Sequence, residues 1–185
     1  EHTIVYNTLQ MYRWDRLAYL KKCYVDAENH HYFLGLKLVR GAYMEKERTR
    51  AKKLGYVSPI QKNKANTDKD YDAAVSFCIE HIDKISICAG THNEYSSVKL
   101  THMLDDKGIH KNDKRVYFSQ LLGMSDHISY NLAHTNYNVA KYVPYGPVKK
   151  VIPYLIRRAE ENTSIGGQTS RELSLIIKEK SRRNT

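Results

Sequence analysis

The sequence predicts an α/β fold built on a parallel sheet, and three observations support this prediction. Strand-like and helix-like segments alternate along the chain, as they do where helices connect parallel strands. No repeat or linker interrupts the alternation, so we expect a single domain over residues 1–185. This length of 185 residues is short for a complete (βα)8 barrel, which needs about 250 residues. A doubly wound sheet and a part of a (βα)8 barrel both remain open.

The first four elements are predicted to be two strands, each followed by a helix. Residues 3–11 (TIVYNTLQM) are rich in β-branched and aromatic residues, and residues 15–29 place apolar side chains at helical spacing. Residues 32–39 (YFLGLKLV) form a nearly continuous apolar run, which is typical of a strand buried on both faces. Residues 44–54 are charged and helical, and Gly55 follows as a C-terminal cap.

The middle of the chain repeats this alternation. A helix is predicted over residues 67–84, beginning at a Thr-Asp cap. Strands at residues 85–89 and 115–121 lie before and after a helix over residues 94–107. A short helix follows at residues 125–133.

The last part of the chain is predicted to hold one strand and two helices. The strand covers residues 138–143, and Pro147 begins a helix that runs to about residue 162, since proline is favoured in the first turn. Two glycines, Gly166 and Gly167, interrupt the helical pattern. A basic helix over residues 170–182 completes the series of five strands.

The composition excludes several classes of protein. The net charge is +10, from 30 Lys+Arg and 20 Asp+Glu, but the excess is dispersed and no RNA- or DNA-binding motif accompanies it. A solvated surface is the favoured explanation, followed by weak attraction to a membrane surface. No apolar run approaches the roughly 20 residues of a membrane span. The three cysteines form no CxxC pair, and their odd number predicts no disulfide framework and a reducing compartment.

Polar groups stand at the carboxyl end of every predicted strand, where parallel α/β folds bind their ligands. These strand ends are Gln10, residues 40–43, residues 91–93, residues 119–121 and Tyr142. For Thr91 and Asn93, helix capping explains the residue type equally well. His92 has no second ligand at metal spacing, so we predict no metal site, and neither a dinucleotide-binding nor a P-loop motif occurs.

Lys37 interrupts an otherwise apolar strand. Alternation along the strand places Lys37 and Val39 on one face and Leu36 and Leu38 on the other. A lysine that points into a barrel must meet a negative group or shift its pKa. The alternative is an edge strand with the lysine in solvent.

A second cluster of charge lies on the predicted helix after Pro147. Tyr154, Arg157, Arg158 and Glu161 follow one another at i, i+3, i+4 and i+7, on one face of the helix. Two adjacent arginines beside a tyrosine can clamp an anion, and Glu161 can orient them. A solvated face with intrahelical ion pairs fits the same spacing.

Five sequence blocks, taken together, resemble the proline dehydrogenase family. They are KLVRGAY at residues 37–43, THN at 91–93, QLLGM at 120–124, YVPYGP at 142–147 and PYLIRRAEEN at 153–162. Their order and spacing match the family over nearly the whole chain, and the pattern is closer to the stand-alone mitochondrial enzymes than to the large bifunctional bacterial ones.

The resemblance implies a fold, a reaction and a cofactor. The family folds as a parallel (βα)8 barrel with FAD over the carboxyl ends of the strands, and a final helix closes the proline site. It oxidises L-proline to Δ1-pyrroline-5-carboxylate in proline catabolism, and the electrons pass to FAD and then to a membrane quinone. We therefore expect peripheral membrane contact and no nucleic-acid partner, with a location in the cytoplasm or, in a eukaryote, on the matrix side of the inner mitochondrial membrane.

The resemblance also implies roles for individual residues. Arg157 and Arg158 would bind the proline carboxylate, with Glu161 holding them. The wall around the substrate ring would consist of Tyr43, Leu121, Tyr142 and Tyr154. Lys37 would lie beside the flavin N5, and Tyr142 favours proline over hydroxyproline. The remaining contacts to FAD would come from Gln10, Val39, Gly41, Ala42, Lys64, Thr67, His92, Asn93, Gln120, Arg158, Glu161 and Ser164.

The chain departs from the family in its number of strands. We count five strands and a C-terminal helix where the family has eight strands, so we expect the carboxyl-terminal part of the barrel. Its two open edges predict a homo-oligomer. A non-catalytic half-barrel that binds an anionic ligand or a partner chain is the alternative, and a basic nucleic-acid-binding module is a third.

Overall fold

A computed structural model of the chain describes residues 3–164 and 168–183, with side chains for residues 3–158 and 173–183. The sheet contains five strands, which are β1 (Tyr6–Gln10), β2 (Leu34–Val39), β3 (Ile85–Gly90), β4 (Val116–Leu121) and β5 (Val139–Tyr142). The helices are α1 (Arg16–Asn29), α2 (Met44–Leu54), α3 (Lys64–Glu80), α4 (Glu94–Asp106), α5 (Asp126–His134), α6 (Val148–Ser164) and α7 (Gln168–Arg183).

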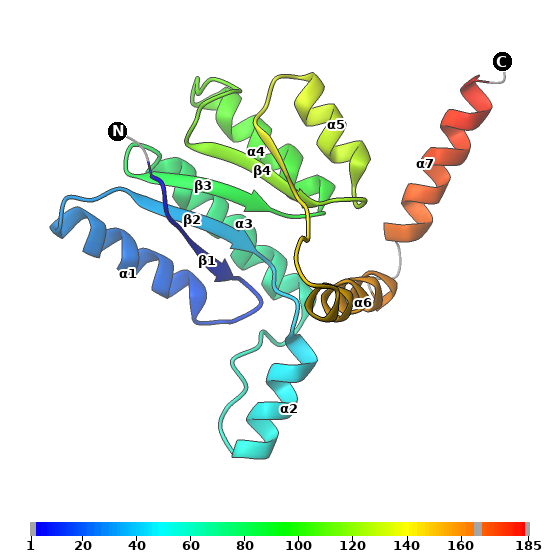
Figure 1. Cartoon of the computed structure of the whole chain (residues 1–185). Coiled ribbons are helices and arrows are strands. Elements are labelled where there is room, and N and C mark those ends of the chain that lie inside the picture. The colour runs from blue at the N-terminus through cyan, green and yellow to red at the C-terminus, as the bar shows by residue number, and fades with distance from the viewer. Residues whose placement is uncertain (1–2, 165–167, 184–185) are drawn as a thin grey trace.

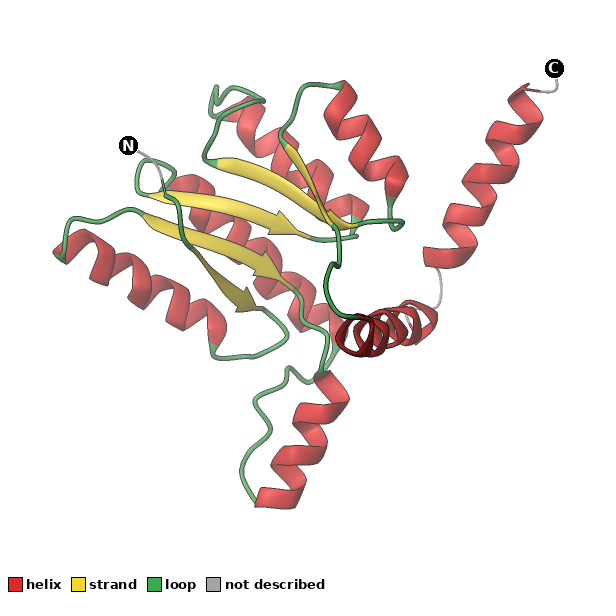
Figure 2. Cartoon of the chain, in the orientation of Figure 1, coloured by secondary structure: helices red, strands yellow, loops and turns green. Residues whose placement is uncertain are grey.

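The strands are all parallel and lie in the order β1-β2-β3-β4-β5. This chain order confirms the predicted parallel sheet and decides between the two architectures, since a doubly wound sheet reverses its order at a switch point. The helices α1, α3, α4 and α5 cover one face of the curved sheet (Figures 1 and 2). The fold is therefore that of five consecutive βα units of a parallel barrel.

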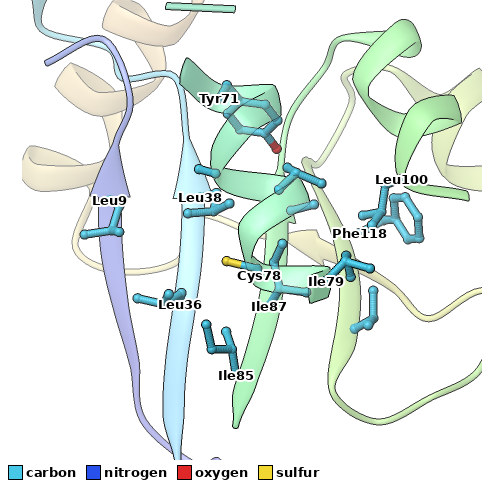
Figure 3. Packing of buried hydrophobic residues seen from close by; sticks show 14 of the residues in the cluster. Leu9, Leu36, Leu38, Tyr71, Cys78, Ile79, Ile85, Ile87, Leu100 and Phe118 are labelled. Atoms are coloured by element: carbon cyan, nitrogen blue, oxygen red, sulfur yellow. The ribbon is translucent and has the colours of Figure 1, made fainter. Parts of the chain in front are cut away.

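The hydrophobic core fills the space between the sheet and these helices. Leu36, Leu38 and Ile87 are fully buried and point toward α3, which contributes Tyr71 and Cys78 from its inner face (Figure 3). Side chains on a strand alternate between the two faces, so their neighbours in sequence point to the opposite, concave face.

Lys37 lies on this concave face, as its position in the strand predicted. It is half-buried between fully buried Leu36 and Leu38, and β2 pairs with β1 on one side and β3 on the other. β2 is thus an internal strand, which excludes the alternative of a solvated lysine on an edge strand.

Three helices lie beyond the carboxyl ends of the strands. α2 projects away from the end of β2, α6 lies close to the carboxyl edge of the sheet, and α7 extends away from it (Figure 1). Among the residues that the structure describes, no helix has the length and apolar character needed to cross a membrane. The helices α2 and α6 therefore lie nearest to the carboxyl edge of the sheet (Figure 1).

The predicted boundaries are correct to within a few residues, and the largest differences are at α3, which begins before the predicted residue 67 and ends at Glu80 rather than at residue 84. The helix begins at Lys64, because the Asn63 side chain caps it by accepting a hydrogen bond from the Asn66 backbone N–H at 2.8 Å. The Thr-Asp pair at residues 67–68, predicted as the cap, therefore lies inside the helix.

The three cysteines are all free thiols.

Candidate active site at the carboxyl edge of the sheet

An ammonium group occupies the concave face of the sheet near its carboxyl edge. Lys37 pairs in register with Thr8 on β1 and Cys88 on β3, and its Nζ lies 5.6 Å from the centroid of the Tyr142 ring. Burial raises the pKa of the Cys88 thiol, and the nearby Lys37 partly opposes that rise. The face thus presents one positive charge beside an aromatic ring, an arrangement stabilised by cation–π attraction.

A second positive charge lies across the same aromatic ring system. The ring centroids of Tyr142 and Tyr154 are 6.1 Å apart in an edge-to-face arrangement. The Arg158 guanidinium carbon lies 5.2 Å from the centroid of the Tyr154 ring and 5.4 Å from that of Tyr43. We call these five residues, Lys37, Tyr43, Tyr142, Tyr154 and Arg158, the tyrosine–cation cluster.

The cluster draws on distant parts of the chain. Lys37 lies within β2 and Tyr142 ends β5. Tyr43 stands just before α2, and Tyr154 and Arg158 lie on α6. Three aromatic faces and two cations form a surface suited to a small molecule that carries both an apolar ring and a carboxylate. Each of these five residues was a predicted site residue.

The two arginines of the predicted clamp differ in their surroundings. Arg158 is half-buried in the tyrosine–cation cluster, whereas Arg157 is exposed, because consecutive helical residues point about 100° apart. Glu161 and Ser164 belong to α6, but their side chains lie outside the described residues. The joint action of Arg157, Arg158 and Glu161 stays a prediction.

Leu121 stands beside the cluster on the neighbouring strand. It pairs in register with Tyr142, and the backbone N–H of Leu122 donates to the Tyr142 carbonyl oxygen at 3.0 Å. Leu121 is half-buried. It therefore extends the aromatic surface with an aliphatic side chain.

Gly90 keeps the concave face open beside Lys37, and it was not a predicted site residue. A Cβ at Gly90 would lie 2.9 Å from Val39 Cγ1 and 3.4 Å from Lys37 Cε, so the missing side chain leaves room for both neighbours. Gly41 has a φ of +110°, and a Cβ there would meet the Tyr12 ring. Glycine at position 41 therefore permits the close approach of the Tyr12 ring. Ala42 beside it is half-buried. Gln10 pairs in register with Val39.

A network of charges joins the amino end of α3 to the sheet. Asp68 accepts hydrogen bonds from Lys64 Nζ and Arg40 Nε, each at 2.6 Å. Burial opposes ionisation of Asp68, but these two hydrogen bonds outweigh it and lower the pKa of the carboxyl group. Thr67 is buried, while Lys64 is largely exposed at the surface.

Arg40 is the centre of this network; the sequence placed it among the polar strand ends but gave it no individual role. Its other guanidinium nitrogens donate to Thr91 Oγ1 at 2.8 Å and Ser96 Oγ at 2.9 Å, and its plane lies over the Tyr71 ring. It therefore ties β2, α3 and α4 together. Its place directly after the apolar run of β2 was the signal in the sequence.

The predicted residues of β3 and β4 form a third group. His92 Nδ1 lies 3.0 Å from Ser125 Oγ, and Asn93 caps α4 by accepting from the Ser96 backbone N–H at 3.0 Å. Gln120 is buried beneath α5, where it donates to the Thr91 carbonyl oxygen and accepts from Ser129 Oγ. The His92 side chain thus contacts the loop that follows β4, whereas Asn93 caps a helix and Gln120 packs beneath one.

Comparison with known proteins identifies related sequences and structures. The family model described as proline dehydrogenase matches residues 1–171. The chain is 40% identical to human proline dehydrogenase 1, mitochondrial. This match covers 99% of the chain and 31% of that protein. The chain is 38% identical to hydroxyproline dehydrogenase of Xenopus laevis, and this match covers 97% of the chain and 39% of that protein. The crystal structure of proline utilization A from Bdellovibrio bacteriovorus superposes with a TM-score of 0.81 at 27% identity, over 87% of this chain and 17% of that one.

Proposed function

Because the chain belongs to the proline dehydrogenase family, we propose that it forms part of a (βα)8 barrel that oxidises L-proline to Δ1-pyrroline-5-carboxylate. The chain spans less than two fifths of the length of the two curated relatives described above. We accordingly propose the activity for the whole barrel, to which this chain contributes a substrate and cofactor surface. The observation that carries the proposal is the tyrosine–cation cluster.

The cluster fits the substrate in shape and charge. L-proline has a carboxylate and an apolar five-membered ring, and the cluster offers the Arg158 guanidinium beside the rings of Tyr43 and Tyr154. Arg158 binds the carboxylate together with Arg157, and Glu161 orients both guanidinium groups. The tyrosine rings and Leu121 enclose the pyrrolidine ring and exclude water from it.

The concave face also fits FAD. The space beside Gly90 leaves the half-buried Lys37 ammonium facing the sheet opening, where a cation stabilises negative charge that develops nearby. Near the amino end of α3, the exposed Lys64 ammonium group would bind a phosphate of FAD, a charge that it shares with its ion pair to Asp68. We assign the remaining cofactor contacts to the residues named for FAD from the sequence, among them Gln10, Thr67 and His92.

FAD would supply the acceptor for the hydride that leaves the substrate carbon, while the substrate nitrogen loses a proton. The chain's own residues bind and orient the substrate for this step. Arg158 fixes the carboxylate end, and the tyrosine rings fix the plane of the substrate ring against the concave face. The Lys37 ammonium group places a positive charge on the concave face beside the Tyr142 ring during this step.

The electrons are then passed to a quinone, and the protein makes peripheral contact with the membrane that holds it. The human relative is named as mitochondrial. For a eukaryotic source, we therefore propose the matrix side of the inner mitochondrial membrane. For a bacterial source, we propose the cytoplasm.

The absorbance of the purified protein tests this function. We expect the protein to keep visible flavin absorbance after incubation with FAD and removal of the unbound FAD by gel filtration. L-proline should bleach that absorbance under anaerobic conditions, with D-proline as the control. A protein that stays colourless and inert with both compounds would contradict catalysis by this chain. Comparison of L-proline with hydroxyproline then decides the substrate, and we expect proline to be preferred.

A binding half-barrel is the second candidate, and one observation favours it. In the described part of the chain the sheet has five strands, so that β1 and β5 each carry an unpaired edge. Parallel edges of this kind pair readily with another chain, which also supports a homo-oligomer. Saturable binding of L-proline without any bleaching would favour this candidate, and light scattering measures the oligomeric state.

A further inference from the structure

The ammonium group of Lys141 on β5 lies near three oxygen atoms of the protein, and the proposed reaction gives this residue no role. Lys141 Nζ donates to the Met124 carbonyl oxygen at 2.8 Å and to Asp126 Oδ1 at 2.7 Å, and it lies 3.4 Å from the Leu121 carbonyl oxygen. An ammonium group has three N–H donors, and here one acceptor faces each of them. The side chain is 21% exposed, in contrast to Lys64 in its ion pair at 67%.

All three acceptors belong to one loop and its junctions. The segment over residues 121–126 leaves the end of β4 and enters α5. The Met124 carbonyl oxygen points at the ammonium group at 2.8 Å, while the Leu121 carbonyl oxygen also accepts from the Met124 backbone N–H at 3.1 Å. Lys141 thus joins β5 to both ends of this segment, beside the backbone hydrogen bonds that the segment makes itself.

The loop carries groups on both sides of the candidate site. At its start, Leu121 is the register partner of Tyr142 in the tyrosine–cation cluster. At its end, Ser125 is buried with a φ of +51°, and its Oγ lies 3.0 Å from His92 Nδ1. A left-handed conformation is unfavourable for serine and persists only where the surrounding contacts hold it.

Lys141 does not belong to the tyrosine–cation cluster. Its neighbour in the strand, Tyr142, faces Lys37 across the concave face, and alternation turns Lys141 to the other face, toward Asp126 in the first turn of α5. The contacts of its ammonium group reach the site through the loop, and hydrogen exchange in the loop separates this route from one along the β5 backbone.

We propose that Lys141 is a positioning residue, which fixes the loop over residues 121–126 and thereby sets the places of Leu121 and His92. The effect on turnover rests on the proposed function, whereas the effect on the loop does not. The two effects are measured separately.

Hydrogen exchange of the full chain tests the effect on the loop. In Lys141→Met, which keeps a similar side-chain length without the charge, we expect the amides of residues 122–129 to exchange at least about tenfold faster, as for loss of a hydrogen bond to a charged group. Exchange over residues 108–118 stays unchanged. Lys141→Arg restores protection, and Lys111→Met, an exposed lysine between α4 and β4, has no effect on the loop. Unchanged exchange at residues 122–129 in Lys141→Met would overturn the proposal.

Steady-state kinetics test the effect on the site. Since Leu121 lies beside the substrate surface, we expect Lys141→Met to raise KM for L-proline by about tenfold with a smaller change in kcat, and Lys141→Arg to recover most of the loss. A lower melting temperature with unchanged KM and kcat would refute the positioning role. If the wild-type protein does not oxidise proline, the proposed function fails, and the exchange experiment still decides the role of Lys141 in the loop.

Discussion

The Lys37 ammonium group lies 5.6 Å from the centroid of the Tyr142 ring, although β3 and β4 separate the strands that carry the two residues. In a flat sheet, three strand spacings would hold the two backbones about 14 Å apart. Their side chains meet because the sheet curves toward its concave face, as it does in a barrel. Curvature, and not sequence proximity, therefore brings these two side chains of the tyrosine–cation cluster together.

Replacement of Arg158 tests the carboxylate site. Arg158→Met should lower kcat/KM for L-proline at least about 100-fold, because the charged hydrogen-bond partner of a carboxylate is lost. The circular dichroism spectrum and melting temperature should stay close to those of the wild type. Lys150→Met, at an exposed position of the same helix, is the matched control and should keep normal turnover. Near-normal turnover in Arg158→Met would refute the assignment.

The charge of Lys37 can be measured without any substrate. Burial raises the pKa of the Cys88 thiol, and Lys37 opposes that rise, so Lys37→Met should raise this pKa further. A higher pKa leaves less thiolate at a given pH, and Cys88 should react more slowly with iodoacetamide at pH 8.5. Peptide mass spectrometry separates its alkylation from that of Cys23, whose rate serves as the control. Equal rates at Cys88 in both proteins would show that Lys37 does not act on the thiol.

Periodicity predicted the fold well because each element carries its own signal. The alternation of Leu36, Lys37 and Leu38 identified the two faces of β2, and the structure confirms it. The cap of α3 was misplaced because Thr67 and Asn63 are both acceptable capping residues by type, and only the backbone geometry selects Asn63.

The candidate site was harder to predict, because its contacts connect distant segments. The sequence blocks pointed to Tyr43, Tyr142 and Arg158, but spacing on a helix does not show that Arg157 is exposed while Arg158 is half-buried. Arg40 was named only as one of the polar strand ends, and Lys141 was not named, because the acceptors of both side chains lie on other elements. Such roles become visible only when the elements are packed together.

Gly90 offers a test of the space around Lys37. In Gly90→Ala the new Cβ would lie 2.9 Å from Val39 Cγ1 and 3.0 Å from the Leu38 carbonyl oxygen, and we expect a loss of about 1–3 kcal/mol of unfolding free energy. Flavin binding should weaken as well, since Val39 and Lys37 must move. Gly55→Ala meets no atom within 4 Å and serves as the control, where only the cost of a positive φ remains. Equal effects of the two changes on flavin affinity would rule out crowding at Gly90.

The stability of the network around Asp68 should depend on pH. The folded-state pKa of Asp68 is lowered, because its hydrogen bonds with Lys64 and Arg40 outweigh the effect of burial, while the unfolded chain keeps a value of about 3.9. The ionised group therefore stabilises the fold above about pH 4, and this contribution is lost as the pH falls through the folded-state pKa.

Urea unfolding of Asp68→Asn at two pH values measures this contribution. At pH 7 we expect the variant to be less stable than the wild type by about 1–3 kcal/mol, because two charged donors lose their carboxylate. At pH 3 the difference should shrink, since protonation increasingly removes the charge in the wild type too. Asp106→Asn, at an exposed position at the end of α4, should show no such dependence. An equal loss at both pH values in Asp68→Asn would mean that packing, rather than the charge, accounts for its effect.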